Sequence, residues 1–260
     1  MWERSELKRK AKNVLNTTYW SSVLVCFILS ALGGFGGRAG SAGSSGNSYT
    51  EGLEHTLDQL TSGQLLAILA VVAAIVIGAS VIGLVLRIFV MNPLEVGAMR
   101  YFMESREQKS SVGCLGYAFK NNYMNIIITM VLKGLFTWRW SLLLVVPAII
   151  KSYEYRMIPY IMAENPEISH QDAFRLSKEM MDGEKWNAFV LDLSFILWCL
   201  LGAVTCGLAL IFYVAPYMQH TNAELYAVLR EKVLINGVSN TYELKGFGSD
   251  TMPNDWNRPY

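Results

Sequence analysis

The sequence predicts an all-α integral membrane protein: a bundle of six transmembrane helices in three hairpins, with amphipathic helices at the interface. Composition is the first reason, because 52% of the residues are hydrophobic and only 17% are charged, unlike an ordinary soluble domain. The second reason is the run 65–86, which carries no charge and exceeds the about 20 residues that a bilayer core requires. The third is the placement of aromatic residues beside apolar runs.

Aromatic rings flank the apolar runs where a headgroup layer would hold them. Two tryptophans precede the run 142–150, two tyrosines follow it, and a further tryptophan opens the next apolar segment. We expect these residues to act as interfacial anchors. They are Trp138, Trp140, Tyr153, Tyr155 and Trp186.

The chain divides into three regions by charge and by small residues. Residues 1–17 combine five cations with apolar residues at helical spacing, which predicts a basic amphipathic helix able to lie on an anionic membrane face. Residues 18–235 form the six-helix membrane domain, with a flexible Gly- and Ser-rich loop at 33–48. Residues 236–260 form a polar C-terminal tail that we expect to be mobile.

A cleaved signal peptide is an alternative interpretation of the first region. It would also show a basic start and an apolar run that ends near small residues. The basic region of this chain is long, strongly helical and contains Trp2, which favours a retained helix.

The apolar segment 123–150 can be interpreted as one helix or as two. A single helix would carry Lys133 and Arg139 through the hydrocarbon, at roughly 2.5 to 3.5 kcal/mol each. Two helices, at about 122–136 and 138–162, would keep both cations at an interface. We therefore expect two helices.

The segment between Trp186 and Tyr217 poses the same choice, and we expect a tight turn at Gly202. The distribution of cations supports two helices in both segments. With six spans, 19 of the 22 lysines and arginines share one side with both termini, whereas a four-span arrangement leaves only 14 there. The positive-inside rule then makes both termini cytoplasmic. The three cations expected on the other side are Arg38, Lys133 and Arg139.

A weak threefold pattern of an interfacial helix followed by a hairpin runs through the chain. Each hairpin ends at a proline, namely Pro93, Pro159 or Pro216. The alternative is that any helix crossing an interface ends in aromatic residues and proline. After the second hairpin, we expect a helix with Ser169 as its N-cap and Gly183 as its stop.

Asp192 is the most costly residue of the membrane domain, because its carboxylate lies within an apolar run. Arg156 and Arg87 each precede a proline at a similar depth, and we expect Asp192 to pair with one of them, in the first place Arg156. Glu154 and Glu95 are further acids near the same interface. Two roles are open for the pair: it fastens adjacent hairpins, or it serves transport or proton transfer.

No catalytic or cofactor motif occurs in the sequence. It lacks a nucleophile elbow, a phosphate-binding loop, a dinucleotide fingerprint and a zinc-protease motif, so we expect no enzyme and no cofactor. The three histidines and four cysteines show no metal-ligand spacing, so we expect no metal site. No nucleic acid partner is expected.

Several short motifs are distinctive in combination: ELKRKAKNVL, the run from Trp140 to Pro147, KSYEYRMIPYIMAENP, SKEMMDGEKW and FYVAPY. Together they resemble a bacterial membrane family known as domain-of-unknown-function family 975, over nearly all of the chain between Glu6 and Glu231. Ala148 stands where the family pattern has Gly. The family is similar in layout to the membrane domain attached to some glycerophosphodiester phosphodiesterases, but this chain has no room for their catalytic barrel. The resemblance implies a polytopic protein of the bacterial cytoplasmic membrane with no established activity.

Two classes of function remain. The first is a non-enzymatic scaffold or accessory subunit of the bacterial cytoplasmic membrane, whose partners are the lipid bilayer, anionic lipids and an unidentified membrane protein. The alternative is a small transporter, or an export or immunity factor, with a polar cavity around Asp192, Arg156 and Pro147. A continuous polar cavity would favour transport, and a dry, packed bundle would favour scaffolding.

Overall fold

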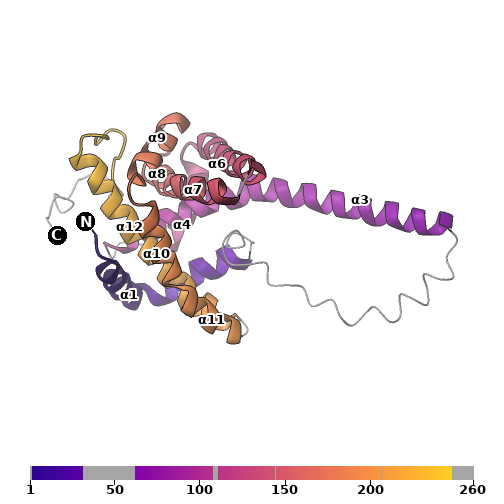
Figure 1. Cartoon of the computed structure of the whole chain (residues 1–260), viewed down its shortest axis with the longest axis horizontal. Coiled ribbons are helices and arrows are strands. Elements are labelled where there is room, and N and C mark those ends of the chain that lie inside the picture. The colour runs from indigo at the N-terminus through magenta and orange to yellow at the C-terminus, as the bar shows by residue number, and fades with distance from the viewer. Residues whose placement is uncertain (1, 32–61, 108–110, 144, 206, 248–260) are drawn as a thin grey trace.

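The computed structural model describes residues 2–31, 62–107, 111–143, 145–205 and 207–247. Over these residues the chain is helical and contains no strand, so the all-α prediction is confirmed. A packed body of helices occupies one end of the molecule, and α3 (Ser62–Leu86) projects from it as a single long helix (Figure 1). The predicted loop at 33–48 lies outside the described residues.

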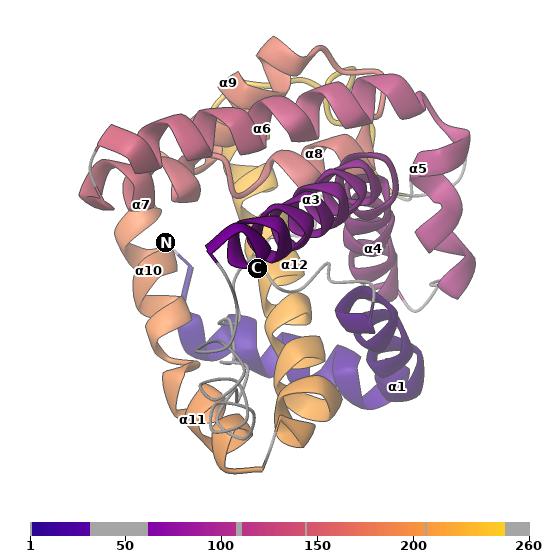
Figure 2. The ribbon, with the colours of Figure 1, turned by 90° about the vertical axis from the view of Figure 1, so that its right-hand side faces the viewer.

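Three helices that begin at prolines form the centre of the body. They are α4 (Asn92–Ser105), α8 (Ile158–Glu164) and α12 (Ala215–Ile235), and each has its proline in the first turn, a position that proline favours. Helix α4 packs against both α8 and α12, and every residue of α8 is buried. Viewed along α3, α12 runs through the middle of the body (Figure 2). We call α4, α8, α12 and the neighbouring α9 (His170–Met180) the central body.

Short π-helical segments precede two of these prolines. The segment η1 (Arg87–Met91) ends two residues before Pro93, and η3 (Leu210–Val214) ends two residues before Pro216. A proline cannot donate to the carbonyl four residues earlier, and its ring pushes that carbonyl away, which widens the preceding turn. The threefold sequence pattern thus has the same backbone feature at two of its three prolines. A common origin of the three units stays a hypothesis.

Helix α1 (Arg4–Ala31) bends at Thr18, whose φ of −116° and ψ of 22° are not helical. This bend separates the basic amphipathic helix from the first apolar run, as the sequence predicts. Leu7, Ala11 and Leu15 are buried in the same cluster as Leu229 of α12, so this helix presents only its polar side outward.

The segment 123–150 forms two helices, but their junction is not where the sequence predicts it. Helix α6 (Tyr123–Leu143) continues through Arg139, and α7 (Val145–Glu154) follows it. The expected boundary near 137 is therefore about two turns too early. The boundary was predicted before Arg139 because a charge inside a membrane span is costly. An arginine near a helix end can instead extend its long side chain to the interface.

The last hairpin turns after Gly202 rather than at it. Helices α10 (Lys185–Leu193) and α11 (Ile196–Val204) lead into a turn with Gly207 at a φ of +86°, a conformation that favours glycine. Gly202 lies within α11, where a Cβ atom would collide with the side chain of Leu210. This glycine therefore lets the two limbs of the hairpin approach each other closely.

The region between α8 and α10 follows the prediction. The Ser169 hydroxyl accepts a hydrogen bond from the Asp172 backbone N–H at 3.1 Å, which caps α9. Gly183, with a φ of +74°, follows the end of that helix. Two short elements, η2 (Val112–Gly116) and α5 (Tyr117–Lys120), join α4 to α6.

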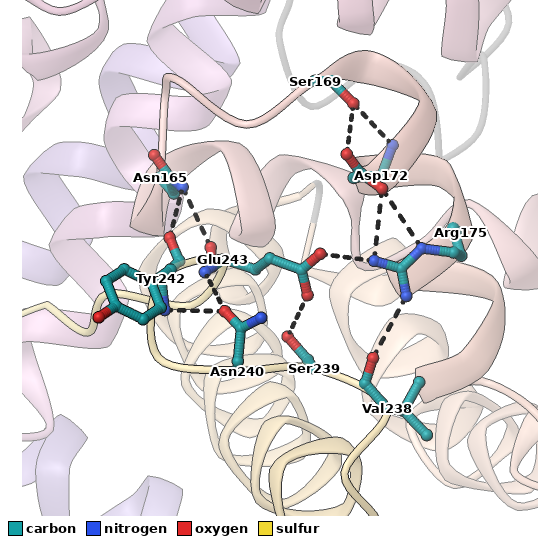
Figure 3. Close-up of polar contacts among 9 residues, drawn as sticks. All are labelled: Asn165, Ser169, Asp172, Arg175, Val238, Ser239, Asn240, Tyr242 and Glu243. Atoms are coloured by element: carbon teal, nitrogen blue, oxygen red, sulfur yellow. Dashed lines mark hydrogen bonds and ion pairs between the residues drawn. The ribbon is translucent and has the colours of Figure 1, made fainter.

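The expectation of a mobile tail from 236 is wrong for residues 236–247. Leu244 and Phe247 are buried in the core. Asn165 donates from Nδ2 to the carbonyl oxygen of Glu243 at 3.1 Å, and Arg175 donates to the Glu243 carboxylate at 2.6 Å (Figure 3). The sequence suggested mobility because this segment contains few apolar residues. Residues 248–260 lie outside the described part of the chain.

Exposed apolar side chains are concentrated on the predicted membrane segments. Two stretches, Leu69–Ser105 and Lys185–Gly202, are long and apolar enough to cross a membrane by length and composition. None of the large exposed hydrophobic residues lies on α4, α8 or α9, which are described throughout. Among the described residues only these two stretches meet that criterion, so the six-span bundle is not confirmed.

Candidate functional site

An ion pair between Arg156 and Asp192 is the centre of the candidate site. Nη1 and Nη2 of Arg156 donate to Oδ2 and Oδ1 of Asp192, each at 2.8 Å. This two-pronged geometry is the strongest arrangement for an arginine and a carboxylate. The predicted pairing is confirmed, and Arg87, the other candidate partner, lies exposed at the start of η1.

Two further side chains complete the site. The Tyr153 hydroxyl donates to Oδ2 of Asp192 at 2.8 Å, and Nη2 of Arg156 donates to Oδ1 of Asn222 at 2.6 Å. The site therefore joins α7, the turn before α8, α10 and α12. The sequence analysis missed Asn222. The sequence feature that could have indicated Asn222 is its polar amide, which lies six residues after Pro216 among many apolar residues of the same helix.

Burial and bonding indicate a structural tie. The Arg156 side chain is 3% exposed and that of Asp192 is 29% exposed. Both carboxylate oxygens accept hydrogen bonds from protein groups, which leaves them poorly placed to bind a substrate. Nε of Arg156 is buried and has no hydrogen-bond partner among the described residues. A hollow lined by Phe136, Arg139, Trp140 and Tyr155 lies nearby but does not include Asp192.

The other two acid candidates belong to separate ion pairs. Glu154 is buried and accepts from Nζ of Lys151 at 2.6 Å and also from Lys185. Glu95 lies 3.5 Å from Nζ of Lys133 on α6. The five polar candidates thus do not form one site.

The five aromatic anchors differ in their exposure and in their contacts. Trp138 and Trp186 are 62% and 71% exposed, as residues that face a headgroup layer would be. Trp140 lies under Nζ of Lys151, which is 5.5 Å from the ring centre. Tyr153 and Tyr155 instead have internal contacts, with Asp192 and with Phe174 of α9 respectively. These two tyrosines support the fold more directly than an interface.

A second buried polar network joins the tail to the central body, and the sequence analysis missed it. Glu164 accepts from Nε of Arg230 at 2.8 Å, from the Tyr226 hydroxyl at 2.7 Å and from the Gly246 backbone N–H at 2.7 Å. Arg230 also donates to the Leu244 carbonyl oxygen at 3.1 Å. Because the carboxylate has several donors, its burial is compensated.

One serine–histidine contact resembles part of a catalytic arrangement. Oγ of Ser22 lies 2.8 Å from Nε2 of His220, and Oγ of Ser105 lies 3.5 Å from its Nδ1. Burial lowers the pKa of His220 to about 4. Ser22 and His220 are both buried, and within the described part of the chain no carboxylate is bonded to the ring, so this contact packs α1 against α12 rather than presenting a nucleophile.

Comparison with known proteins gives a family match over part of the chain. Residues 139–233 match the family model described as Protein of unknown function (DUF975). No curated protein and no solved structure matches the chain, so the similarity in layout to glycerophosphodiester phosphodiesterase membrane domains is not shown. The matched segment contains Arg156, Asp192 and Asn222. The similarity to this family of unknown function is limited to that segment of the chain.

Proposed function

We propose that the protein is a non-enzymatic scaffold or accessory subunit embedded in the bacterial cytoplasmic membrane. One observation carries this proposal: large apolar side chains are exposed on α3, α6, α7, α10 and α11, while the central body buries its own apart from Ile235 at the end of α12. So much exposed apolar surface is unfavourable in water and favourable in lipid. The central body then forms the water-facing part, tied together by its ion pairs.

The proposed topology has six membrane segments in three hairpins, with both termini cytoplasmic. Contacts at Glu184 support a shared face for the two ends. Its Oε2 accepts from Nε1 of Trp2 at 3.0 Å, and its Oε1 lies 3.9 Å from Nζ of Lys232 near the end of α12. The excess of cations in the segments on this side agrees with the positive-inside rule.

Anionic lipids are proposed as a partner of the basic helix at the start of α1. Arg9 and Lys12 are exposed there, opposite the buried stripe. A cation near an anionic leaflet contributes about 1 kcal/mol, so this helix would hold the body against the membrane by charge rather than by insertion.

Scaffolding explains the candidate site better than transport does. The Arg156–Asp192 pair is closed by Tyr153 and Asn222, as a tie between helices would be. The alternative, a transporter or an export or immunity factor, needs a polar cavity at Asp192. Its carboxylate would have to release Arg156 during a cycle.

Native membranes provide the test. A tagged chain should stay in the membrane pellet after alkaline carbonate washing, and it should co-purify with a defined membrane protein in fixed ratio. Asp192→Asn, if it still assembles, should keep that partner. Release into the carbonate supernatant would contradict membrane embedding, and a pure chain that moves a solute across liposomes, abolished by Asp192→Asn, would favour the alternative.

A further inference from the structure

We propose that two of the three hairpins are re-entrant: α6–α7 and α10–α11–η3 enter the cytoplasmic leaflet and turn back inside the hydrocarbon. The occupant of their exposed apolar faces is the acyl layer of that leaflet. This inference rests on the proposed membrane location and concerns how deep each hairpin goes.

The depth of α6 is set by its contacts with polar elements. The Phe136 ring lies 5.4 Å from that of Phe174, on α9. Helix α9 carries Asp172 and Arg175, which are 45% and 41% exposed and bond to each other, so it belongs in water or headgroups. Phe136 therefore lies at the level of the cytoplasmic interface.

Two more contacts agree with this depth. Lys133 lies beside Glu95, at the start of α4, and Trp140 lies beside Lys151. The sequence analysis placed Lys133 and Arg139 on the opposite face from Glu95 and Lys151. Ends of a membrane span are about 30 Å apart, so residues in contact cannot lie on opposite faces. Lys133 and Glu95 therefore lie on the same face, contrary to the sequence-based expectation.

The part of the α6–α7 hairpin beyond Phe136 is too short to cross the bilayer. From Phe136 to the end of α6 at Leu143 the helix rises only about 10 Å, a third of the about 30 Å hydrocarbon core. By contrast, α3 has 25 residues and is about 37 Å long, enough to cross.

The hairpin α10–α11–η3 is likewise too short to cross the bilayer. Nζ of Lys8, in the basic part of α1, lies 4.3 Å from the centre of the Phe195 ring. From Phe195 to the end of α11 at Val204 the chain rises about 14 Å, or half of the core. Asp192, three residues before Phe195, lies at the same interface with Arg156.

Several described groups of the turn after α11 are paired within the hairpin, as backbone groups in hydrocarbon must be. The Thr205 hydroxyl accepts from the Ala209 N–H at 3.2 Å and donates to the Leu201 carbonyl oxygen at 3.0 Å. The Gly207 N–H donates to the Gly202 carbonyl oxygen at 2.8 Å. One apolar side chain beside each turn is strongly exposed, Leu142 at 68% and Val204 at 82%.

Cysteine labelling tests this depth. In a chain whose four cysteines are replaced by alanine, single cysteines are introduced as Leu142→Cys and Val204→Cys, with Gly43→Cys and Asn236→Cys as controls. Intact cells and inside-out vesicles are treated with a membrane-impermeant maleimide, which reacts only with thiols in water. We expect 142 and 204 to be protected on both sides, 43 to react from outside, and 236 to react from inside.

The other outcomes overturn the inference in different ways. Reaction of 142 or 204 from outside would show full crossing and would leave the proposed function intact. Reaction of both from inside, as fast as 236, would show that the hairpins lie in water. Reaction of 43 and 236 from the same side would contradict the proposed topology itself.

A second variant covers the case in which the cysteine-free chain does not assemble. Val204→Lys in the otherwise unchanged chain would bury a charge within the leaflet, so we expect several-fold less membrane-assembled protein. Ile235→Lys, at a residue that is 75% exposed at the end of α12, is the matched control and should have no effect. Equal yields of the two variants would overturn the inference.

Discussion

The Tyr123 hydroxyl donates a hydrogen bond to the carbonyl oxygen of Phe89 at 2.7 Å. Phe89 is four residues before Pro93, so it is the carbonyl that would accept from residue 93 in an ordinary α-helix. Proline leaves that carbonyl free, and a side chain from α6 binds it. The proline therefore both widens the helix into η1 and creates a docking point for α6.

Tyr123→Phe should lower the free energy of unfolding by about 1 kcal/mol, the net value of one hydrogen bond. In a Pro93→Ala background the backbone N–H of residue 93 can bind the Phe89 carbonyl, so the same substitution should cost less. A double-mutant cycle by thermal unfolding in detergent measures the coupling. Equal costs in both backgrounds would contradict the proline-based explanation.

Asp192→Ala should destabilise the protein by about 3 to 5 kcal/mol, because it leaves the Arg156 charge buried without a partner. Replacing both residues, as Asp192→Leu with Arg156→Met, should cost much less, since no uncompensated charge remains. Unfolding temperatures in detergent give the comparison. A single variant as stable as the unchanged chain would contradict the structural role of the pair.

Leu244→Ala should cost about 2 to 5 kcal/mol, because Leu244 is fully buried although it lies in a polar tail. Tyr242→Ala is the matched control two residues away, where the side chain is 86% exposed, and it should change stability by no more than about 0.5 kcal/mol. Equal effects of the two variants would mean that residues 236–247 are not packed in solution.

Acid should weaken the protein through His220, whose pKa is about 4 in the folded chain because it is buried. The ordinary value of about 6.5 applies to the unfolded chain. Above pH 6.5 both states are neutral and stability is full. As the pH falls from 6.5 towards 4, only the unfolded state binds the proton, which costs up to about 3 kcal/mol.

His220→Gln is the control for this effect. It keeps a polar group beside Ser22 but cannot titrate, so its stability should depend less on pH between 6.5 and 4 than that of the unchanged chain. Unfolding midpoints at several pH values measure the difference. Parallel curves for the two proteins would show that another group causes the acid sensitivity.

Local sequence signals predicted those parts of the structure that depend on neighbouring residues. Ser169 caps α9, and the helix bends at Thr18, where the sequence changes from basic and amphipathic to apolar. The pairing of Arg156 with Asp192 was also predictable, because a carboxylate in an apolar run needs a cation at a similar depth.

Features that depend on distant contacts were not predictable in this way. The sequence predicted a turn at Gly202. In the structure Gly202 instead allows Leu210 to approach closely, and Gly207 lies in the turn. The burial of Leu7 and Leu15 against α12, and of Leu244 in the core, required knowledge of which helix lies beside which. An apolar stripe indicates that one face of a helix is buried, but it does not indicate whether lipid or protein covers that face.

The side of the membrane reached by two points of the chain tests the central claim most directly. Reporters that are active in only one compartment are fused after residue 43 and at the carboxyl end of the full chain. The account predicts that the reporter at 43 is active outside the cytoplasm and the terminal one inside it. Activity of both in the same compartment would contradict a chain that crosses the membrane through α3 with its central body on the cytoplasmic face.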